Sequence, residues 1–406
     1  MQYFKTIRVD EAVERMLAIA NDRPPLTETV DLNDAAGRSL SEAVAAAYDL
    51  PGFTRSTVDG YAVRTADCTG ASSSVPAMLS LSGEVRMGEE TTIRLARGQA
   101  VYVPTGGMVP EGADAMVMIE QTRELGDLCL VYQSPAVHQH MILKGEDVQK
   151  GDVLLEKGTR IGPESAGMLA ALSVFEVPVY VRPTVSILST GNEIADRDEP
   201  LGAAKIRDIN SYTLRADAER LGCRVISARL LPDDKTQLIE AVKEEAARAD
   251  FVFLSGGSSV GTRDYTKDAI TALSGELLFH GLNISPGKPT LAGWADGTWI
   301  IGLPGNPVSA LLVFRSILYP YWEARYGALP RRTSVTARLT ENMASQPGKM
   351  TLQPVRLTEG EGEWLATPLY GPSAFISRLV RADGLIAVPM EKEGLYAGDL
   401  VEVERL

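Results

Sequence analysis

The sequence predicts a multidomain protein of mixed α/β and β class, in which a three-layer α/β domain with a mainly parallel sheet is flanked by β-rich regions. Between residues 182 and 328, apolar runs of strand length alternate with stretches of helical length. Such alternation gives a parallel sheet with helices on both faces. Residues 49–141 and 329–406 instead contain short β-prone runs separated by Gly, Pro and Asp. A chain of 406 residues has room for about two to four domains.

Residues 1–48 and 142–181 are predicted to form one discontinuous, elongated helical domain around a β-rich insert, residues 49–141. The first piece has apolar residues at helical spacing, among them Val13 and Met16. The second contains the run GPESAGMLAAL, which we expect to be a short helix. The region between them reads as strands, namely MLSLSG, TIRLARGQAVYV, DAMVMIEQT and LCLVYQ. Because the two outer pieces resemble each other more than the strands between them, we interpret 49–141 as an insertion.

The α/β domain is predicted to span residues 182–328. Its expected strands are TVSILST, CRVISARLL, DFVFLS and WIIGL, and its expected helices are NSYTLRADAERLG, DDKTQLIEAVKEEAARA and NPVSALLVFRSILYPYWEARYG. Asn210 is predicted to cap the first of these helices. Asn306 is predicted to cap the last one, with Pro307 in its first turn. Residues 329–406 are predicted to form a small C-terminal β domain, a barrel or a sandwich.

Composition excludes several classes of protein. The formal net charge of −13 argues against nucleic-acid and anionic-membrane partners, so an anionic substrate needs a local pocket. No apolar run approaches the ~20 residues that span a bilayer. The N-terminus carries charges throughout, unlike a signal peptide. Three widely spaced cysteines fit a reduced compartment better than a disulfide framework. We therefore expect a soluble, cytoplasmic protein.

Three loops at predicted strand ends carry the candidate chemistry: STGNE, SGGSSVGTRD and GLPGNP. The carboxyl ends of parallel strands share one rim, where ligands bind. The glycines of the second loop allow a close backbone approach, and the following helix start favours an anion. Glu193 and Asp264 would stand beside that anion. A magnesium ion reconciles them, because it typically uses one or two carboxylates plus substrate oxygens.

Common nucleotide signatures are absent, since neither GxxxxGK[ST] nor GxGxxG occurs in the loop. The expected ligand is therefore less common than ATP or NAD. Outside the α/β domain, three polar segments stand out: RSTVDGYAVR with Asp59, VPTGGMVPEGADAMVMIEQ with Thr105, and KGEDVQKGD with Asp147. The segment containing Asp59 is also compatible with a simple turn that leads into a strand.

Taken in order, these segments resemble the molybdopterin molybdenumtransferase family of molybdenum cofactor biosynthesis, to which the C-terminal domain of gephyrin also belongs. The matching pieces cover roughly residues 50–315: STVDGYAVR, PTGGMVPEGADAMVM, KGEDVQKGD, ILSTGNE, IRDINSYTLRA, LPDDKTQL, LSGGSSVGTRDYTKD, PGKP and GLPGNPVSALLVF. The resemblance implies a magnesium-dependent transferase that uses molybdate and adenylylated molybdopterin (molybdopterin-AMP), inserts molybdenum into the dithiolene and releases AMP. It also implies an elongated homodimer whose site combines both subunits, with a molybdopterin adenylyltransferase as a further partner.

The resemblance also implies the site residues. The catalytic set is Asp59, Thr105, Asp147, Glu193, Asp233 and Asp264. Within that set, Glu193, Asp233 and Asp264 are assigned to magnesium. The set that binds the pterin nucleotide is Ser255, Gly256, Gly257, Ser259, Gly261, Lys288, Pro304, Pro307 and Ser373. Asp59 and Thr105 are expected to close the site from the opposite subunit.

The chain departs from the family pattern at several positions. Asn192 replaces the first acid of STGDE, and Ser258 replaces a valine of SGGVSVG. Ser285 and Gly281 stand where family members carry or can carry lysine, which leaves Lys288. A lysine suits an oxyanion such as molybdate, so these losses bear on metal choice. A weaker match in the C-terminal region points to Lys349 and to the Ser373 already assigned.

Two alternatives to an active molybdenum-inserting enzyme follow. One is a paralogue that binds the pterin nucleotide as a scaffold or carrier, or that prefers tungsten. The other is an adenylyltransferase or nucleotide-cleaving enzyme built on the α/β domain. The segments that contain Asp59 and Thr105 lie outside that domain and speak against the second alternative.

Overall fold

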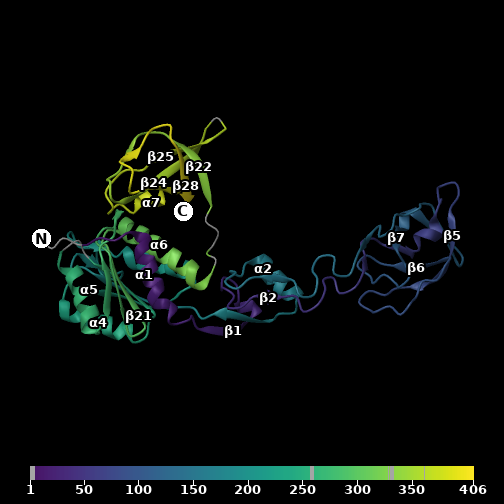
Figure 1. Cartoon of the computed structure of the whole chain (residues 1–406), viewed down its shortest axis with the longest axis horizontal. Helices are drawn as coiled ribbons and strands as arrows, with labels where there is room; N and C mark the ends of the chain where they lie inside the picture. Colours follow the sequence, from purple (N-terminus) through teal and green to yellow (C-terminus); the bar gives the residue numbers. More distant parts are fainter. Residues whose placement is uncertain (1–4, 257–259, 328, 330–332, 361) are drawn as a thin grey trace. The chain divides into compact units, whose positions relative to one another are not determined.

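The computed structural model describes residues 5–256, 260–327, 329, 333–360 and 362–406, without the side chains of 260–264. The chain divides into two compact units, each described by itself below (Figure 1). The larger unit comprises Met1–Glu42, Lys157–Pro163 and Glu176–Leu406, and the smaller comprises Ala43–Glu156 and Glu164–Phe175. Among the described residues, no helix is both long enough and apolar enough to cross a membrane.

A six-stranded sheet forms the centre of the larger unit, in the order β16-β13-β17-β21-β20-β18. The strands are β13 (Thr184–Thr190), β16 (Arg224–Leu231), β17 (Phe251–Gly256), β18 (Glu276–His280), β20 (Leu291–Ala295) and β21 (Thr298–Leu303). The first four strands in spatial order are parallel, and β20 is antiparallel to both of its neighbours. The mainly parallel sheet expected from the alternating pattern is therefore confirmed.

Helices cover both faces of this sheet, which makes the three layers. One face packs against α1 (Val9–Asn21), α3 (Asn210–Leu221) and α6 (Pro307–Tyr326), and the other against α4 (Lys235–Ala246) and α5 (Val260–Ala272). Figure 1 shows α1 and α6 side by side. Successive side chains of a strand point to opposite faces, so β17 sends Phe253 into the first core and Leu254 into the second. Two-sided burial explains why its sequence is continuously apolar.

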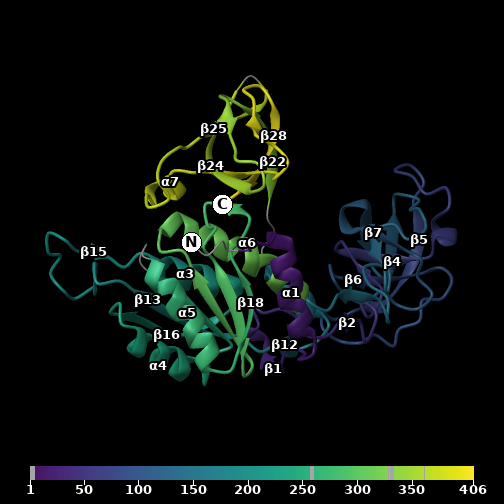
Figure 2. The same cartoon turned by 60° about the vertical axis from the view of Figure 1, so that its left-hand side comes forward.

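The C-terminal region is a closed barrel. Its strands are β22 (Ser334–Leu339), β24 (Met350–Glu359), β25 (Trp364–Pro368), β26 (Gly384–Val388) and β28 (Leu400–Arg405); β22, β24, β25 and β28 are labelled in Figure 2. Pairing of β24 with β26 closes the ring β24-β25-β22-β28-β26. One short strand from the α/β part, β19 (Ile284–Ser285), joins the barrel by pairing with β24. The barrel is thereby attached to the loop that follows β18.

The N-terminal segment corrects one expectation, because its helix ends at Asn21 and residues 27–31 are extended. The dipeptide Pro24-Pro25 follows the helix closely, and proline can neither donate the helical hydrogen bond nor follow an α-helical residue easily. Strand β1 (Thr27–Asp31) pairs with β12 (Glu176–Tyr180) in the larger unit. In the smaller unit, β2 (Val44–Ala45) pairs with β11 (Val153–Leu155). The two predicted pieces therefore meet through strands.

The smaller unit contains the strand-rich region and the short helix α2 (Pro163–Ala171), except for the first residue of that helix, Pro163, which belongs to the larger unit. The sequence predicted a short helix at this place. Its sheet has the order β7-β4-β6-β5-β9-β8. The strands are β4 (Gly60–Val63), β5 (Ala77–Glu84), β6 (Gln99–Val103), β7 (Ala115–Met118), β8 (Thr122–Leu125) and β9 (Leu128–Val131). Cys68 and Cys129 are buried in this sheet's core, and Cys223 is buried in the larger unit; all three are free thiols.

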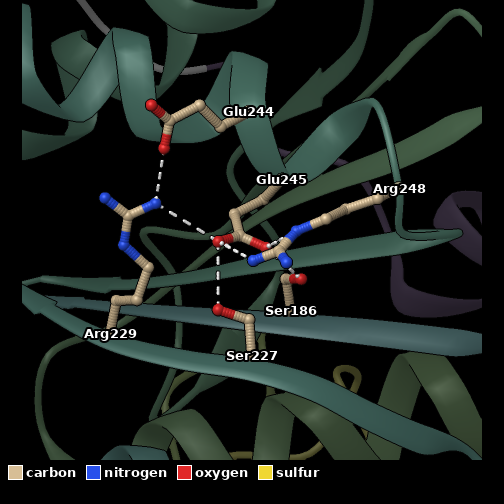
Figure 3. Close-up of polar contacts among 6 residues, drawn as sticks. All are labelled: Ser186, Ser227, Arg229, Glu244, Glu245 and Arg248. Atoms are coloured by element: carbon tan, nitrogen blue, oxygen red, sulfur yellow. Dashed lines mark hydrogen bonds and ion pairs between the residues drawn. The ribbon is translucent and has the colours of Figure 1, made fainter.

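A buried carboxylate fastens α4 and the turn after it to the edge of the large sheet (Figure 3). Glu245, which is fully buried, accepts hydrogen bonds from Ser186 Oγ of β13 at 2.7 Å and Ser227 Oγ of β16 at 3.0 Å. Arg248 and Arg229 also donate to it, at 2.7 Å and 3.3 Å. Burial by itself raises the pKa of Glu245, but these donors outweigh it and lower the pKa to about 2.

Candidate functional site

A pocket of about 290 Å³ lies where the parallel strands end. Its walls come from the ends of β13, β17 and β21, from residues 284–289 and 304–306, and from two barrel loops. Gly256, Lys288, Pro304 and Ser373, four residues of the expected nucleotide-binding set, line it together. Ligand sites in open α/β sheets occur at this rim. We refer to it as the rim pocket.

The PGKP loop forms one wall of the rim pocket and is held against helix α6. Gly287 has φ of 125°, and a Cβ there would lie 2.1 Å from Val313 Cγ2 of α6, so only glycine fits. On the other side the loop meets the barrel, where Met350 N–H donates to Asn283 O at 2.9 Å. Lys288 and Ser285 both line the pocket, and the Lys288 side chain is exposed.

The PGNP loop forms a second wall and begins α6, as the sequence predicted. Pro307 is the first residue of α6 and Asn306 precedes it. Asn306 does not cap the helix with its side chain; instead its Nδ2 donates to Ser373 Oγ at 2.9 Å. Val308 N–H donates to Ser373 O at 3.0 Å. Ser373, from a barrel loop, is thus fixed at the N-terminus of α6, an end that favours anions.

Asn210 was predicted to be a helix cap, and that prediction is wrong. Ile209 precedes α3, and Asn210 is its first residue, buried between strand ends. Its Nδ2 donates to Ser255 Oγ at 2.5 Å and to Gly305 O at 2.8 Å. A buried amide needs such partners, and here they tie β17 to the PGNP loop. Ser255, which is 2% exposed, is therefore connected to the PGNP loop through the Asn210 side chain.

The acidic residues Glu193 and Asp233 follow adjacent strands, β13 and β16. Asp233 N–H donates to Asn192 Oδ1 at 3.2 Å, which joins the two loops. Asp233 Oδ1 is buried and has no hydrogen-bond partner within the described residues. A buried carboxylate oxygen without a partner is costly, and a cation would supply the missing partner. Two carboxylate-bearing loops brought together in this way fit magnesium, which prefers oxygen ligands.

The SGGSSVGTRD loop is only partly described. Gly257 and Ser259 lie outside the described residues, so the expected phosphate cradle is not visible. Gly261 and Asp264 belong to α5 by their backbone, and the Asp264 carboxylate lies outside the description. Among the described residues, no group of three or more His, Cys, Asp or Glu side chains gathers as a metal site.

The three remaining catalytic candidates lie in the smaller unit, and the structure brings two of them together. Thr105 N–H donates to Asp59 Oδ1 at 2.8 Å. Gly60, the residue after Asp59, lets β4 approach β7 closely, because a Cβ there would lie 2.0 Å from Val117 O of β7. Asp147 lies in another turn, where its N–H donates to Leu50 O at 3.1 Å. All three candidate side chains are exposed.

Two residues of the site were missed by the sequence-based reasoning. Thr190, the last residue of β13, lines the rim pocket, and its Oγ1 is buried without a partner among the described residues. Its position within the STGNE segment, one of the three candidate loops, was the sequence signal that could have identified it as a site residue. The role of Asn210 could not be recognised, because both of its partners are distant in sequence. Lys349, a weak match in the sequence, does line the rim pocket.

Comparison with known proteins gives three consecutive family matches. Residues 7–173 match the MoeA N-terminal region (domain I and II), residues 186–324 a probable molybdopterin binding domain, and residues 336–406 the MoeA C-terminal region (domain IV). A curated relative from Haemophilus influenzae, named molybdopterin molybdenumtransferase, is 33% identical over 404 residues, covering 98% of each chain. The chain belongs to the molybdopterin molybdenumtransferase family.

Other members of the molybdopterin molybdenumtransferase family agree. The Staphylococcus aureus (strain Mu50) relative of that name is 31% identical over 399 residues, 98% of this chain and 95% of its own. Two solved MoeA structures from Pyrococcus horikoshii are 33% and 30% identical, with TM-scores of 0.83 and 0.82; they cover 99% of this chain, which covers 99% and 100% of theirs. The family and the fold class expected from the sequence are confirmed, and the chain is assigned as a transferase to molybdenum cofactor biosynthesis.

Proposed function

We propose that this chain inserts molybdenum from molybdate into adenylylated molybdopterin and releases AMP. The observation that supports this most is the rim pocket, where Lys288, Lys349 and the N-terminus of α6 meet. In a chain of net charge −13, cations gathered in one pocket favour a small anionic substrate. The family membership supplies the identity of that substrate, and water that cleaves the pyrophosphate link leaves AMP and the molybdopterin phosphate.

Magnesium is proposed to be held by Glu193 and Asp233, together with Asp264. When bound, it would neutralise phosphate oxygens of the nucleotide. The chain's own residues bind and orient the substrates. Lys288 and Lys349 attract the oxyanion, and Ser373, fixed by Asn306, presents a hydroxyl beside it. The buried Asp233 Oδ1, which has no hydrogen-bond partner in the part of the chain that the structure describes, supports this assignment.

Assembly is also proposed. The active form is a homodimer, in which Asp59 and Thr105 of one subunit complete the rim pocket of the other and Asp147 acts on the same side. A molybdopterin adenylyltransferase delivers the nucleotide.

We also propose the division into four domains given in the sequence analysis. Two of the family matches begin at residues 186 and 336, close to two of the proposed boundaries, and support this division. The free, buried thiols are compatible with the cytoplasmic location that we propose.

An assay with purified protein, adenylylated molybdopterin, magnesium and molybdate tests the function. We expect AMP release that depends on molybdate, together with active molybdenum cofactor. Tight nucleotide binding without turnover would instead support a scaffold or carrier, and AMP release that ignores molybdate would indicate a nucleotide-cleaving enzyme. A parallel series with tungstate decides the preferred metal.

Lys349 gives a second test, because it lines the rim pocket together with Ser285, which stands where family members carry a lysine. Replacement of Lys349 by Met is expected to weaken molybdate binding about tenfold or more, since a hydrogen bond to a charged group contributes about 1.5–3 kcal/mol. Adding Ser285→Lys to that variant should restore affinity, because Ser285 lines the same pocket. Isothermal titration calorimetry with molybdate measures both.

The matched control for Lys349 is Lys392→Met, which removes an exposed barrel lysine that does not line the rim pocket. It should bind molybdate as the wild type does. Wild-type affinity in Lys349→Met would show that the barrel contributes no charge to the oxyanion site.

A further inference from the structure

A second pocket, of about 670 Å³, shares no lining residue with the rim pocket. Three parts of the chain form its walls: the segment after β13 that contains β14 (Ile194–Ala195) and β15 (Ile206–Arg207), the first turns of α3, and the end of β16. Its charged lining consists of Arg197, Arg207, Arg215, Arg229, Asp196 and Asp208. We call it the arginine pocket. Arg197 is paired with Asp198 at 3.3 Å, and Arg229 is paired with Glu244 and Glu245. Arg207 and Arg215 therefore supply the positive charge that a ligand can meet in this pocket, within a chain whose net charge is −13.

The two aspartates are already engaged with their own surroundings. Asp208 Oδ1 accepts from Ser211 N–H at 3.1 Å and from Ser189 Oγ at 3.3 Å. Asp196 Oδ1 accepts from Arg197 N–H at 2.5 Å. These hydrogen bonds hold both carboxylates in place. Among the described residues, neither aspartate forms an ion pair with Arg207 or Arg215, so the charge of these two arginines is not neutralised by the pocket's own acids.

Two of the arginines retain capacity for a ligand. Arg207 is exposed; it donates to Asp196 O and has no carboxylate ion pair among the described residues. Arg215 is 43% exposed and reaches its only described partner, Glu219, at 3.8 Å, a distance too long for a hydrogen bond. Guanidinium groups of this kind bind phosphate through two parallel hydrogen bonds.

Arg229 lines the arginine pocket, but its charge is already paired on the other face of the sheet (Figure 3). Its Nη1 contacts Glu244 at 2.7 Å and the buried Glu245 at 3.3 Å, both on α4. Successive side chains of a strand point to opposite faces, and α3 packs on the face that α4 does not cover. Arg207 and Arg215 are therefore the arginines that face a ligand beside Tyr212.

An aromatic ring completes the lining. Tyr212, from the first turn of α3, lines the arginine pocket and is 58% exposed. Exposed aromatic rings stack on planar bases, and each such stack contributes to the binding of nucleic-acid components. We propose that the arginine pocket binds a phosphate monoester carried by a nucleoside, with Arg207 and Arg215 on the phosphate and Tyr212 on the base. This site does not depend on the proposed metal-insertion activity.

Calorimetric titration of the full chain with AMP, adenosine and inorganic phosphate tests this site. We expect AMP to bind, with a Kd at least about tenfold weaker in Arg207→Ala and in Arg215→Ala, since each removes a charged hydrogen-bond donor. Higher ionic strength should weaken binding further. Tyr212→Ala should weaken AMP but not inorganic phosphate, and adenosine alone should bind weakly.

Two controls make the test decisive. Arg224→Ala removes an exposed arginine from the same strand as Arg229 without touching the pocket lining, and should bind AMP like the wild type. Lys349→Met reports on AMP bound in the rim pocket. No AMP binding at all, or binding that Lys349→Met weakens while Arg207→Ala and Arg215→Ala leave it unchanged, overturns the proposal. Circular dichroism verifies that each variant is folded.

Discussion

Replacement of Asp233 by Asn is expected to reduce magnesium-dependent AMP release at least about 100-fold, the scale on which enzymes lose a preorganised charge at the reacting group. The substitution removes the negative charge of the Asp233 carboxylate, whose Oδ1 is buried without a hydrogen-bond partner among the described residues. Since an unpaired buried charge destabilises the fold, the Asn variant should be at least as stable as the wild type. A steady-state assay with a magnesium titration, paired with thermal unfolding, measures both effects.

The neighbouring residue provides the matched control. Asp234 caps α4 by accepting from Gln237 N–H at 2.8 Å, and asparagine caps helices about as well as aspartate. Asp234→Asn should therefore keep both turnover and stability. If Asp233→Asn turned over at close to the wild-type rate, Asp233 would not be a magnesium ligand.

Replacement of Glu245 by Gln is expected to lower the free energy of unfolding by about 3–5 kcal/mol, the typical cost of removing one member of a buried ion pair. Glu245 is fully buried between Ser186, Ser227 and two arginines, and an amide cannot accept all of these donors. Urea unfolding measures the difference. Glu244→Gln, which alters only the exposed partner of Arg229, should change stability by less than about 1 kcal/mol.

The same carboxylate makes stability depend on acidity. The pKa of Glu245 falls from 4.5 to about 2 in the folded protein. A lowered carboxylate pKa contributes stability that is fully present above the unfolded value of 4.5 and is lost as pH falls toward 2, here about 3 kcal/mol. Unfolding curves recorded across this window should converge for wild type and Glu245→Gln at the acidic end. Parallel curves would contradict this role.

Much of the fold could be predicted because the central strands β13, β17 and β21 of the large sheet are buried on both faces. A strand such as β17 then has a continuous apolar sequence, and the helices between strands are long enough to show their period. The extended segment after Asn21 could not be predicted in this way, since β1 is short and largely exposed. Strand pairing with β12 decides its structure, and that partner lies far along the chain.

The candidate site was predictable where its residues follow strand ends. Gly256 and Pro304 belong to adjacent parallel strands or their loops, so topology alone brings them to one rim. Local signals failed where a side chain serves a distant partner. Asn210 stands at a helix start, as a cap would, yet its amide joins residues 255 and 305. The burial of Asp233 Oδ1 without a hydrogen-bond partner among the described residues could be recognised only in three dimensions.

The pairing of Ser285 with Thr351 has a consequence for the rigidity of the rim pocket. Because β19 is a strand of the barrel's own sheet, the wall that carries Lys288 is covalently part of the α/β domain and hydrogen-bonded to the barrel. The barrel cannot be displaced from the α/β domain without either breaking this pairing or moving that wall.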